Sequence, residues 1–187
     1  GYQEGRLDDN YKMKVFDAAC SPLVYRDTVY GQDFENSVFV CETVGNLVSR
    51  YNIEDNEHYN LKPVPAYDQT EFVASTDERF RPVNHTLGPD AALYIVDMYR
   101  GIVQHRMFVT SFLRKQIKAR GLEKPLGLGR IWRIVPIDKS LHEVEKLINA
   151  GAGTLVKKLI HPNGTVRDHA QRLLVENPDG SVEQELR

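Results

Sequence analysis

The feature that most constrains the fold is a repeated series of short β-strand patterns. Residues 20–67 contain four runs rich in β-branched and aromatic residues, separated by turn residues such as Gly and Asn. The fourth run, residues 61–67, contains Pro63 and Pro65, which suit only an edge strand. Four successive antiparallel strands with a protected outer edge are typical of one β-propeller blade.

The same pattern begins again in the second half of the chain. Residues 80–88, 91–98 and 129–136 match the first three runs in order. Because one or two such units cannot bury their sheet faces alone, we expect the remaining blades to lie outside this chain. The predicted fold class is therefore mainly β, formed by the last blades of a β-propeller. An independent β-sandwich is the alternative.

A long insertion distinguishes the second repeat from the first. Residues 100–128 lie between its second and third strands, where the first repeat has only a tight turn. Within the insertion, Thr110 or Ser111 can cap a helix over residues 112–120 that ends at Gly121. Four basic residues lie within this helix: Arg114, Lys115, Lys118 and Arg120. Such charges fit a solvated surface helix, but an insertion of this length also indicates a lid, a docking element or an interface.

The C-terminal part of the chain has helical rather than strand periodicity. Apolar residues recur at helical spacing in residues 140–148 and 154–177. A Pro and a Gly within residues 161–164 predict a turn that divides the second segment into an antiparallel helix pair. This pair resembles a HEAT-type repeat, which needs a further repeat to cover its open face. We therefore divide the chain into propeller blades at 1–136 and a first helical repeat at 137–187.

Charge and hydropathy exclude several classes of protein. The net charge of −2 gives no general attraction for nucleic acid. No run approaches the roughly 18 apolar residues that a membrane-spanning helix requires. The polar start of the chain lacks the apolar region of a signal peptide. We therefore interpret the chain as an internal fragment of a longer polypeptide.

The two cysteines leave two possibilities open. Cys20 and Cys41 do not form a CxxC motif, and no CxxCH motif is present, so we expect neither a metal site nor haem attachment in this segment. If their strands are neighbours, the two residues can form a disulfide, which would fit an oxidising compartment. Otherwise they are two small buried apolar residues.

The candidate site lies where the second repeat begins and its second strand ends. In a propeller blade these two points lie on the same face of the disc, which is where propellers bind ligands. This placement brings together Arg79, Arg81, Asn84, Asp97, Tyr99 and Arg100, with the insertion above them. Arginines clustered there suit the carboxylates of an anionic cofactor or an acidic partner.

Roles follow from the chemistry of these side chains. Arg79, Arg81, Arg100 and Tyr99 are the candidate cofactor-binding residues. His85 or His105 could act as a general base, with Asp97 orienting it. Purely structural roles are the alternative: a cap of the loop that follows for Asp97, ion pairs with nearby carboxylates for the arginines, and a hydrogen-bonded position on the inner strand for His85.

Six segments of the chain occur in the same order in a known family. They resemble the large secreted membrane-bound-dehydrogenase-type proteins of bacteria, and they cover residues 1–9, 18–27, 37–50, 71–106, 126–136 and 161–177. The block DERFRPVN…GPDAALYIVDMYRG is the most specific of these matches. Proteins of this type have a propeller like that of glucose/sorbosone dehydrogenases, followed by HEAT-like repeats and commonly by a c-type cytochrome domain.

The resemblance implies a fold, a location and an activity. It implies part of a six-bladed propeller exported to the periplasm or cell surface and completed by the rest of its polypeptide or by partner chains. Related propellers use pyrroloquinoline quinone to oxidise sugars or alcohols and pass electrons to a c-type cytochrome, so haem is expected only outside this segment. Arg79 and Arg81 would then bind carboxylates of the cofactor or substrate, with His85 or His105 as the base. The alternative is a non-catalytic propeller–solenoid scaffold, or a docking subunit of a larger redox or membrane complex, with the basic helix at 114–124 as its contact surface.

Overall fold

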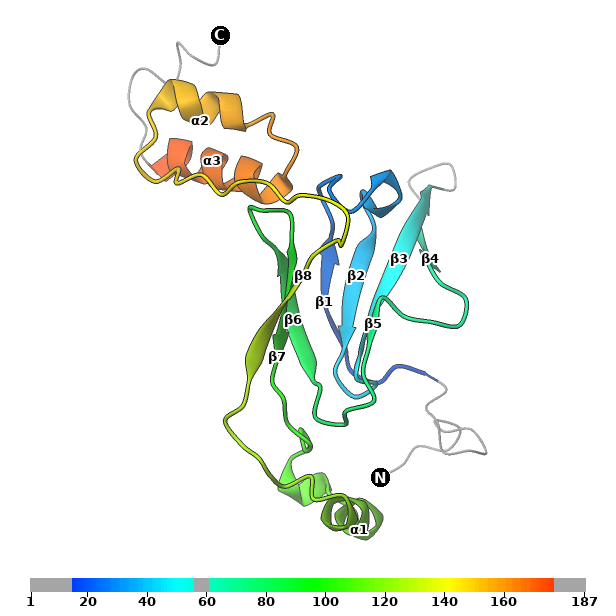
Figure 1. The fold of residues 1–187 in the computed structure, drawn as a ribbon. Coiled ribbons are helices and arrows are strands. Elements are labelled where there is room, and N and C mark those ends of the chain that lie inside the picture. The colour runs from blue at the N-terminus through cyan, green and yellow to red at the C-terminus, as the bar shows by residue number, and fades with distance from the viewer. Residues whose placement is uncertain (1–14, 56–60, 177–187) are drawn as a thin grey trace. The chain divides into compact units, whose positions relative to one another are not determined.

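The computed structural model describes residues 15–55 and 61–176 (Figure 1). Residues 1–9 of the resemblance, and the predicted helical domain beyond residue 176, lie outside the described residues. The chain divides into two compact units, each built from several segments. Unit 1 contains residues 1–23, 38–85 and 94–132, and unit 2 contains residues 24–37, 86–93 and 133–187.

The β part consists of two antiparallel sheets, as the repeated pattern predicts. The first sheet has the order β1-β2-β3-β4, and β5 also pairs with β3. Its strands are β1 (Ala19–Val24), β2 (Val38–Glu42), β3 (Leu47–Asp55), β4 (Leu61–Pro65) and β5 (Val73–Ala74). The second sheet has the order β6-β7-β8, formed by β6 (Pro82–Leu87), β7 (Leu93–Asp97) and β8 (Arg130–Ile134). All seven predicted strands form. The described strands do not close into a propeller or barrel, so the number of blades stays a prediction.

Alternation along the strands places the core of unit 1. In β2, Phe39 and Cys41 are fully buried and point to the same face, because successive side chains alternate between faces. Cys41 lies opposite the buried Val48 of β3 in the antiparallel register. At the outer edge, Pro63 of β4 lies opposite Ile53 of β3, so the proline-containing strand does pair at the edge of this sheet.

The insertion contains the predicted helix. A short 3₁₀ turn, η2 (Arg106–Phe108), precedes α1 (Ser111–Ala119). The Thr110 hydroxyl accepts a hydrogen bond from the Leu113 N–H at 3.2 Å, so Thr110 rather than Ser111 is the cap. Gly121 follows the helix with φ +61°, the left-handed conformation that commonly ends helices.

Unit 2 contains the predicted helix pair, α2 (Ala152–Lys158) and α3 (Gly164–Glu176), which lie side by side in Figure 1. Their shared core is made by Leu147, Leu155, Ala170, Leu173 and Leu174. The short 3₁₀ turn η1 (Gln32–Phe34) belongs to the same unit. The pair is confirmed as two packed helices, whereas its identity as a HEAT-type repeat stays a prediction.

The helical periodicity predicted for residues 140–148 is wrong. This segment has no regular secondary structure, and the His142 N–H donates to the carbonyl of Asp90 at 3.1 Å instead of to a helical neighbour. Only Leu147 enters the core, while Val144 and Ile148 are 60% and 69% exposed. The helical pattern is overridden because the segment buries one apolar side chain and uses its backbone in a tertiary hydrogen bond to Asp90.

Asn163 connects the turn before α3 to the rest of unit 2. Its Oδ1 accepts from the Val166 N–H at 3.1 Å, and its Nδ2 donates to the Gly88 carbonyl at 3.0 Å. Because the side chain is fully buried, Asn163→Ala loses a helix cap and one of the two hydrogen bonds to the Gly88 carbonyl, which also accepts from the Ala91 N–H. We expect a loss of about 2–3 kcal/mol in the free energy of unfolding, measured by urea denaturation.

Asn163→Ser is the matched control for this prediction. A serine hydroxyl can accept from the Val166 N–H, as serine does at helix N-caps, but it is too short to reach the Gly88 carbonyl, so its loss should be smaller. If Asn163→Ala and Asn163→Ser are equally destabilised, the capping bond contributes nothing measurable.

Candidate functional site

Arg81 is the most highly connected of the predicted site residues. Its Nε donates to the Arg100 carbonyl at 2.9 Å, and its Nη2 donates to the Gly101 carbonyl at 3.2 Å. Its Nη1 donates to the carbonyls of Thr43 and Val44 at 2.9 and 3.2 Å. The guanidinium therefore joins the β2–β3 turn to the start of the insertion. Burial lowers the pKa of Arg81, although nearby Glu78, Asp97 and Glu42 oppose that shift.

Asp97, at the end of β7, is a second buried connector. Its Oδ1 accepts from the backbone N–H groups of Arg81 and Tyr99, both at 2.8 Å, and its Oδ2 accepts from Trp132 Nε1 at 3.0 Å. The side chain is 1% exposed. The predicted proximity of Arg81 and Asp97 is thus found, but the contact runs through the backbone N–H of Arg81. Trp132 supplies the third donor.

The remaining arginines and the tyrosine take different positions. Arg79 donates through Nη2 to the carbonyls of Gly121 and Lys124, both at 3.0 Å. The Tyr99 hydroxyl donates to Asp77 Oδ2 at 2.8 Å. A hydrogen bond from the Arg79 N–H, followed by this one from Tyr99, lowers the pKa of Asp77. The Arg130 guanidinium lies over the Tyr99 ring, with its Cζ 3.7 Å from the ring centroid. Arg100 is exposed, and Asn84 Oδ1 accepts a hydrogen bond from the Ser21 hydroxyl at 2.6 Å.

His85 lies in the interior of unit 1 and faces a cysteine. Its Nδ1 is 2.8 Å from Cys41 Sγ, and the side chain is 5% exposed. Burial lowers the pKa of His85 to about 4 and raises the pKa of Cys41 to about 12. Both groups are therefore neutral near pH 7, so this pair is not a thiolate–imidazolium nucleophile.

The lowered pKa of His85 predicts a specific loss of stability in acid. An unfolded histidine takes up a proton near pH 6.5, whereas the folded one does so only near pH 4. Protonation therefore favours unfolding as the pH falls through this range. The contribution is complete above about pH 6.5 and falls by about 3 kcal/mol as the pH approaches 4. We expect His85→Gln to remove this part of the pH dependence of urea unfolding.

His105→Gln is the control for the acid experiment, because His105 is exposed. Its Nδ1 accepts from the Met107 N–H at 3.3 Å at the start of η2. Comparing the two variants tests whether the change belongs to the buried imidazole alone. Equal pH dependence in wild type and His85→Gln would show that the buried imidazole is not the group that titrates.

Both cysteines are free in the structure, so the disulfide alternative is not the one found. Cys20 Sγ lies 3.5 Å from the Val83 carbonyl and 3.7 Å from Thr43 Oγ1. Together with the contact between Cys41 and His85, these distances place each thiol against β6 or the β2–β3 turn. Among the described residues, no group of three or more His, Cys, Asp or Glu side chains is placed to hold a metal ion. No described helix is long and apolar enough to span a bilayer.

A groove of about 740 Å³ lies between α1 and the start of the insertion. Its apolar lining comes from Ile102, Val103, Val109, Phe112, Leu113 and Ile117, and Arg81 also lines it. Gly101 lines the same groove, and a Cβ there would lie 2.5 Å from the Leu122 carbonyl oxygen, so a glycine is needed for this close approach. The sequence indicated the basic residues of this helix but not the groove. The signal was present in the apolar residues at helical spacing.

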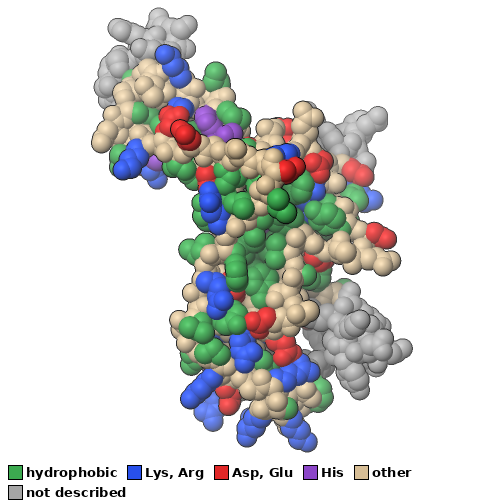
Figure 2. Space-filling model, viewed as in Figure 1, with side chains coloured by type: hydrophobic (Ala, Val, Ile, Leu, Met, Phe, Trp, Pro, Cys, Tyr) green, Lys and Arg blue, Asp and Glu red, His purple; other side chains and the backbone are tan. Residues whose placement is uncertain are grey.

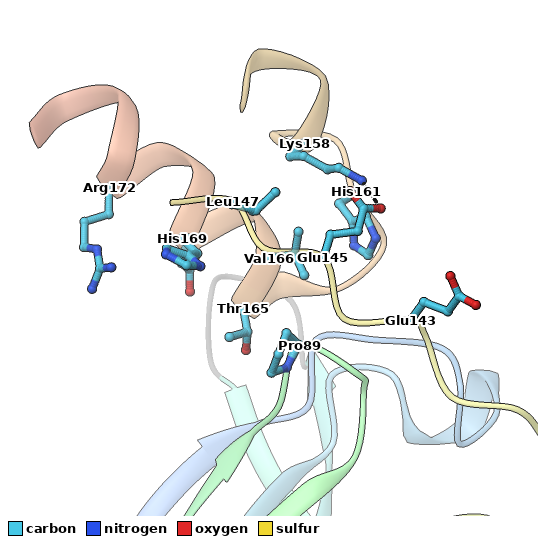
Figure 3. Close-up of a pocket in the computed structure, with 11 residues that line it drawn as sticks. Pro89, Glu143, Glu145, Leu147, Lys158, His161, Thr165, Val166, His169 and Arg172 are labelled. Carbon is cyan, nitrogen blue, oxygen red and sulfur yellow. Dashed lines mark hydrogen bonds and ion pairs between the residues drawn. The ribbon is translucent and has the colours of Figure 1, made fainter. Parts of the chain in front are cut away.

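Unit 2 has a smaller hollow of about 390 Å³, shown in Figure 3. Lys158 and Glu145 meet at its rim, with the Lys158 Nζ 2.6 Å from Glu145 Oε1. Burial and neighbouring His142 lower the pKa of His161, which also lines the hollow. Charges of both signs line this space, so it does not favour one class of ligand.

The predicted quinone site can be tested against these contacts. Pyrroloquinoline quinone is a planar quinone bearing several carboxylates, and its site needs several donors that converge on one cavity. In this structure the predicted site residues make their hydrogen bonds within the protein, as seen for Arg79, Arg81, Asp97 and Tyr99. His85 is buried against Cys41. The described residues therefore do not fit the cofactor, and the dehydrogenase activity stays a prediction.

The fold and the site define a mainly β protein whose basic helical insertion is attached to its sheets by buried arginine contacts. The chain belongs to the family described as "Domain of unknown function (DUF7133)", whose model matches residues 2–138. None of the curated proteins and none of the solved structures matches the chain.

Proposed function

We propose that this chain is a non-catalytic scaffold module that docks an acidic partner through the outward face of α1. The observation that carries this proposal is the separation of charge along the chain. Residues 100–128 contain seven Lys and Arg residues and one acidic residue, whereas the remaining chain contains 17 basic and 25 acidic residues. A strongly basic segment in an acidic chain favours an electrostatic contact surface over general solubility.

The arrangement of α1 supports this proposal. Arg114, Lys115 and Lys118 are exposed, and the apolar residues of the helix line the groove on its other side. Figure 2 shows Lys and Arg side chains gathered where Figure 1 draws α1. None of the three cations has an ion pair within the described residues, so their charge is available to a partner. Complementary charge of this kind steers association and makes it dependent on salt.

The resemblance suggests which partner to examine first. We propose a c-type cytochrome in a larger exported redox assembly, in which this chain supplies the docking surface rather than the oxidation chemistry. The arginines and Asp97 support this choice, because their hydrogen bonds fix the insertion to the sheets. Dye-linked oxidation of a sugar or alcohol by the purified protein, lost in Arg81→Lys that remains folded, would instead support the dehydrogenase prediction.

The test reverses the three exposed charges of α1. We expect Arg114→Glu, Lys115→Glu and Lys118→Glu together to weaken binding of the c-type cytochrome from the same source by about tenfold or more at low ionic strength. High salt should remove most of the difference between wild type and variant. Fluorescence anisotropy with the labelled cytochrome measures both effects.

The control reverses the same number of charges elsewhere. Lys139, Lys146 and Lys157 are exposed residues of unit 2, and their joint reversal to Glu changes the net charge equally. This control should leave binding within about twofold of wild type. Association untouched by reversal of α1, or reduced equally by both triple variants, would show that α1 has no docking role.

A further inference from the structure

The short 3₁₀ turn η2 exposes two consecutive large apolar side chains. Met107 is 84% and Phe108 is 61% exposed. A single exposed apolar residue is common on protein surfaces, but a contiguous exposed pair indicates a surface that contacts a protein or a membrane. Neither residue lines the groove beneath α1. The turn therefore presents an apolar surface of its own.

The backbone of this turn makes its hydrogen bonds internally. The Met107 N–H donates to His105 Nδ1 at 3.3 Å, and the Phe108 N–H donates to the His105 carbonyl at 2.9 Å. The next N–H, that of Val109, donates to the Arg106 carbonyl at 3.3 Å. Because a free N–H group is costly to move out of water, these bonds make it easier for the turn to enter an apolar environment.

The chain around the turn carries positive charge and no acidic residue. Residues 98–122 contain six Arg and Lys residues and no Asp or Glu. All six are exposed: Arg100, Arg106, Arg114, Lys115, Lys118 and Arg120. Arg120 pairs with Glu78, whereas the other five have no ion pair within the described residues. Arg106 belongs to η2 itself, so charge and apolar surface lie together.

A bilayer that contains anionic lipids offers partners for both kinds of side chain. Its phosphates attract Lys and Arg side chains near the surface, and the boundary between headgroups and acyl chains accepts apolar side chains. A soluble acidic partner would match the cations but would leave Met107 and Phe108 in water. For η2, charge and apolar surface together therefore favour a lipid surface.

We propose that η2 inserts Met107 and Phe108 into the surface of an anionic bilayer, with the surrounding cations against the lipid phosphates. The contact reaches one leaflet only. This inference goes beyond the proposed docking role, in which the outward face of α1 binds a protein. Because the docking role does not use Met107 and Phe108, each proposal has residues of its own.

The experiment compares two kinds of vesicle. Cosedimentation with sucrose-loaded vesicles measures binding of the full chain to phosphatidylcholine alone and to phosphatidylcholine mixed with phosphatidylglycerol. We expect binding to the anionic vesicles to be about tenfold tighter or more at low ionic strength. High salt should reduce this difference, because it screens the attraction between the cations and the phosphates.

A double variant removes the apolar contact and keeps every charge. Met107→Ser with Phe108→Ser should weaken binding to the anionic vesicles about tenfold or more. Both residues are exposed, so the variant should fold as wild type does, which circular dichroism checks. Leu61→Ser with Ile131→Ser is the matched control, because these are exposed apolar residues of β4 and β8. This control should bind the vesicles as wild type does.

A tryptophan at the turn reports insertion directly. The chain contains one tryptophan, Trp132, which lies outside η2. In Phe108→Trp, the added indole should shift its fluorescence emission to shorter wavelengths when anionic vesicles are added, because it leaves water. Wild type should show no such shift.

Any of three outcomes would overturn the proposal. They are equal binding to the two kinds of vesicle, equal binding by wild type and the double variant of η2, and no emission shift in Phe108→Trp. Binding of polyglutamate without any binding of anionic vesicles would assign the surface to an acidic protein and would also overturn it. The vesicle assay contains no cytochrome and the docking assay contains no lipid, so either proposal can fail while the other holds.

Discussion

Replacing Arg81 by alanine should lower the free energy of unfolding by about 3–5 kcal/mol, the largest effect that we expect from a single substitution. The guanidinium donates to four carbonyls, in the β2–β3 turn and at the start of the insertion. Alanine leaves these acceptors without their donors and opens a space where the side chain packed. Urea denaturation followed by circular dichroism measures the loss.

Two further substitutions show whether the guanidinium itself is responsible. Arg81→Lys keeps the charge but cannot reach four carbonyls with the same geometry, so it should recover only part of the stability. Arg79→Ala removes bonds to Gly121 and Lys124 at a more exposed site and should cost about 1 kcal/mol. If Arg81→Ala is no more destabilising than Arg79→Ala, the four carbonyl contacts do not stabilise the fold as we infer.

Replacing Asp97 by alanine should lower the free energy of unfolding by about 3–4 kcal/mol. Its carboxylate accepts three hydrogen bonds, from two backbone N–H groups and from the Trp132 indole. The side chain is buried, so alanine leaves these donors without an acceptor and without access to water. The midpoint of urea unfolding should fall accordingly, with an unchanged slope if the unfolded state is unaltered.

Asp97→Asn and Trp132→Phe divide this effect into parts. Asparagine keeps one acceptor oxygen and replaces the other with an NH₂ donor that faces the Trp132 N–H. Asp97→Asn should therefore lower the free energy of unfolding measurably, but by less than Asp97→Ala does. In a double-mutant cycle, Trp132→Phe should lower the free energy of unfolding by less in the Asp97→Asn background than in wild type. Additive effects of the two substitutions would mean that the indole bond contributes nothing to stability.

The sequence predicted the strands well because their signals are local. Alternating apolar residues, turn glycines and the paired prolines 63 and 65 act over a few positions, and all seven strands form. The helix of the insertion was also predictable, since its cap and its terminal glycine lie within one short segment. The segment 140–148 failed because its backbone hydrogen bond reaches Asp90, and no local pattern contains that contact.

The candidate site was predictable in position but not in role. Strand order brings Arg81 and Asp97 together, and the structure places them in contact. What the sequence could not show is that the guanidinium turns towards backbone carbonyls, because carbonyl acceptors have no residue-type signature. His85 shows the same limit, since its burial against Cys41 depends on how the two sheets pack within unit 1.

The two arginines of the site hold the insertion at both ends. Arg81 binds the carbonyls of Arg100 and Gly101 where the insertion begins, and Arg79 binds those of Gly121 and Lys124 after its helix. A segment that swings over a ligand needs a hinge at each end with freedom to rotate. Here both hinge positions are tied to the start of β6. The helix is thus a fixed platform rather than a lid, and a partner can bind it without waiting for a conformational change.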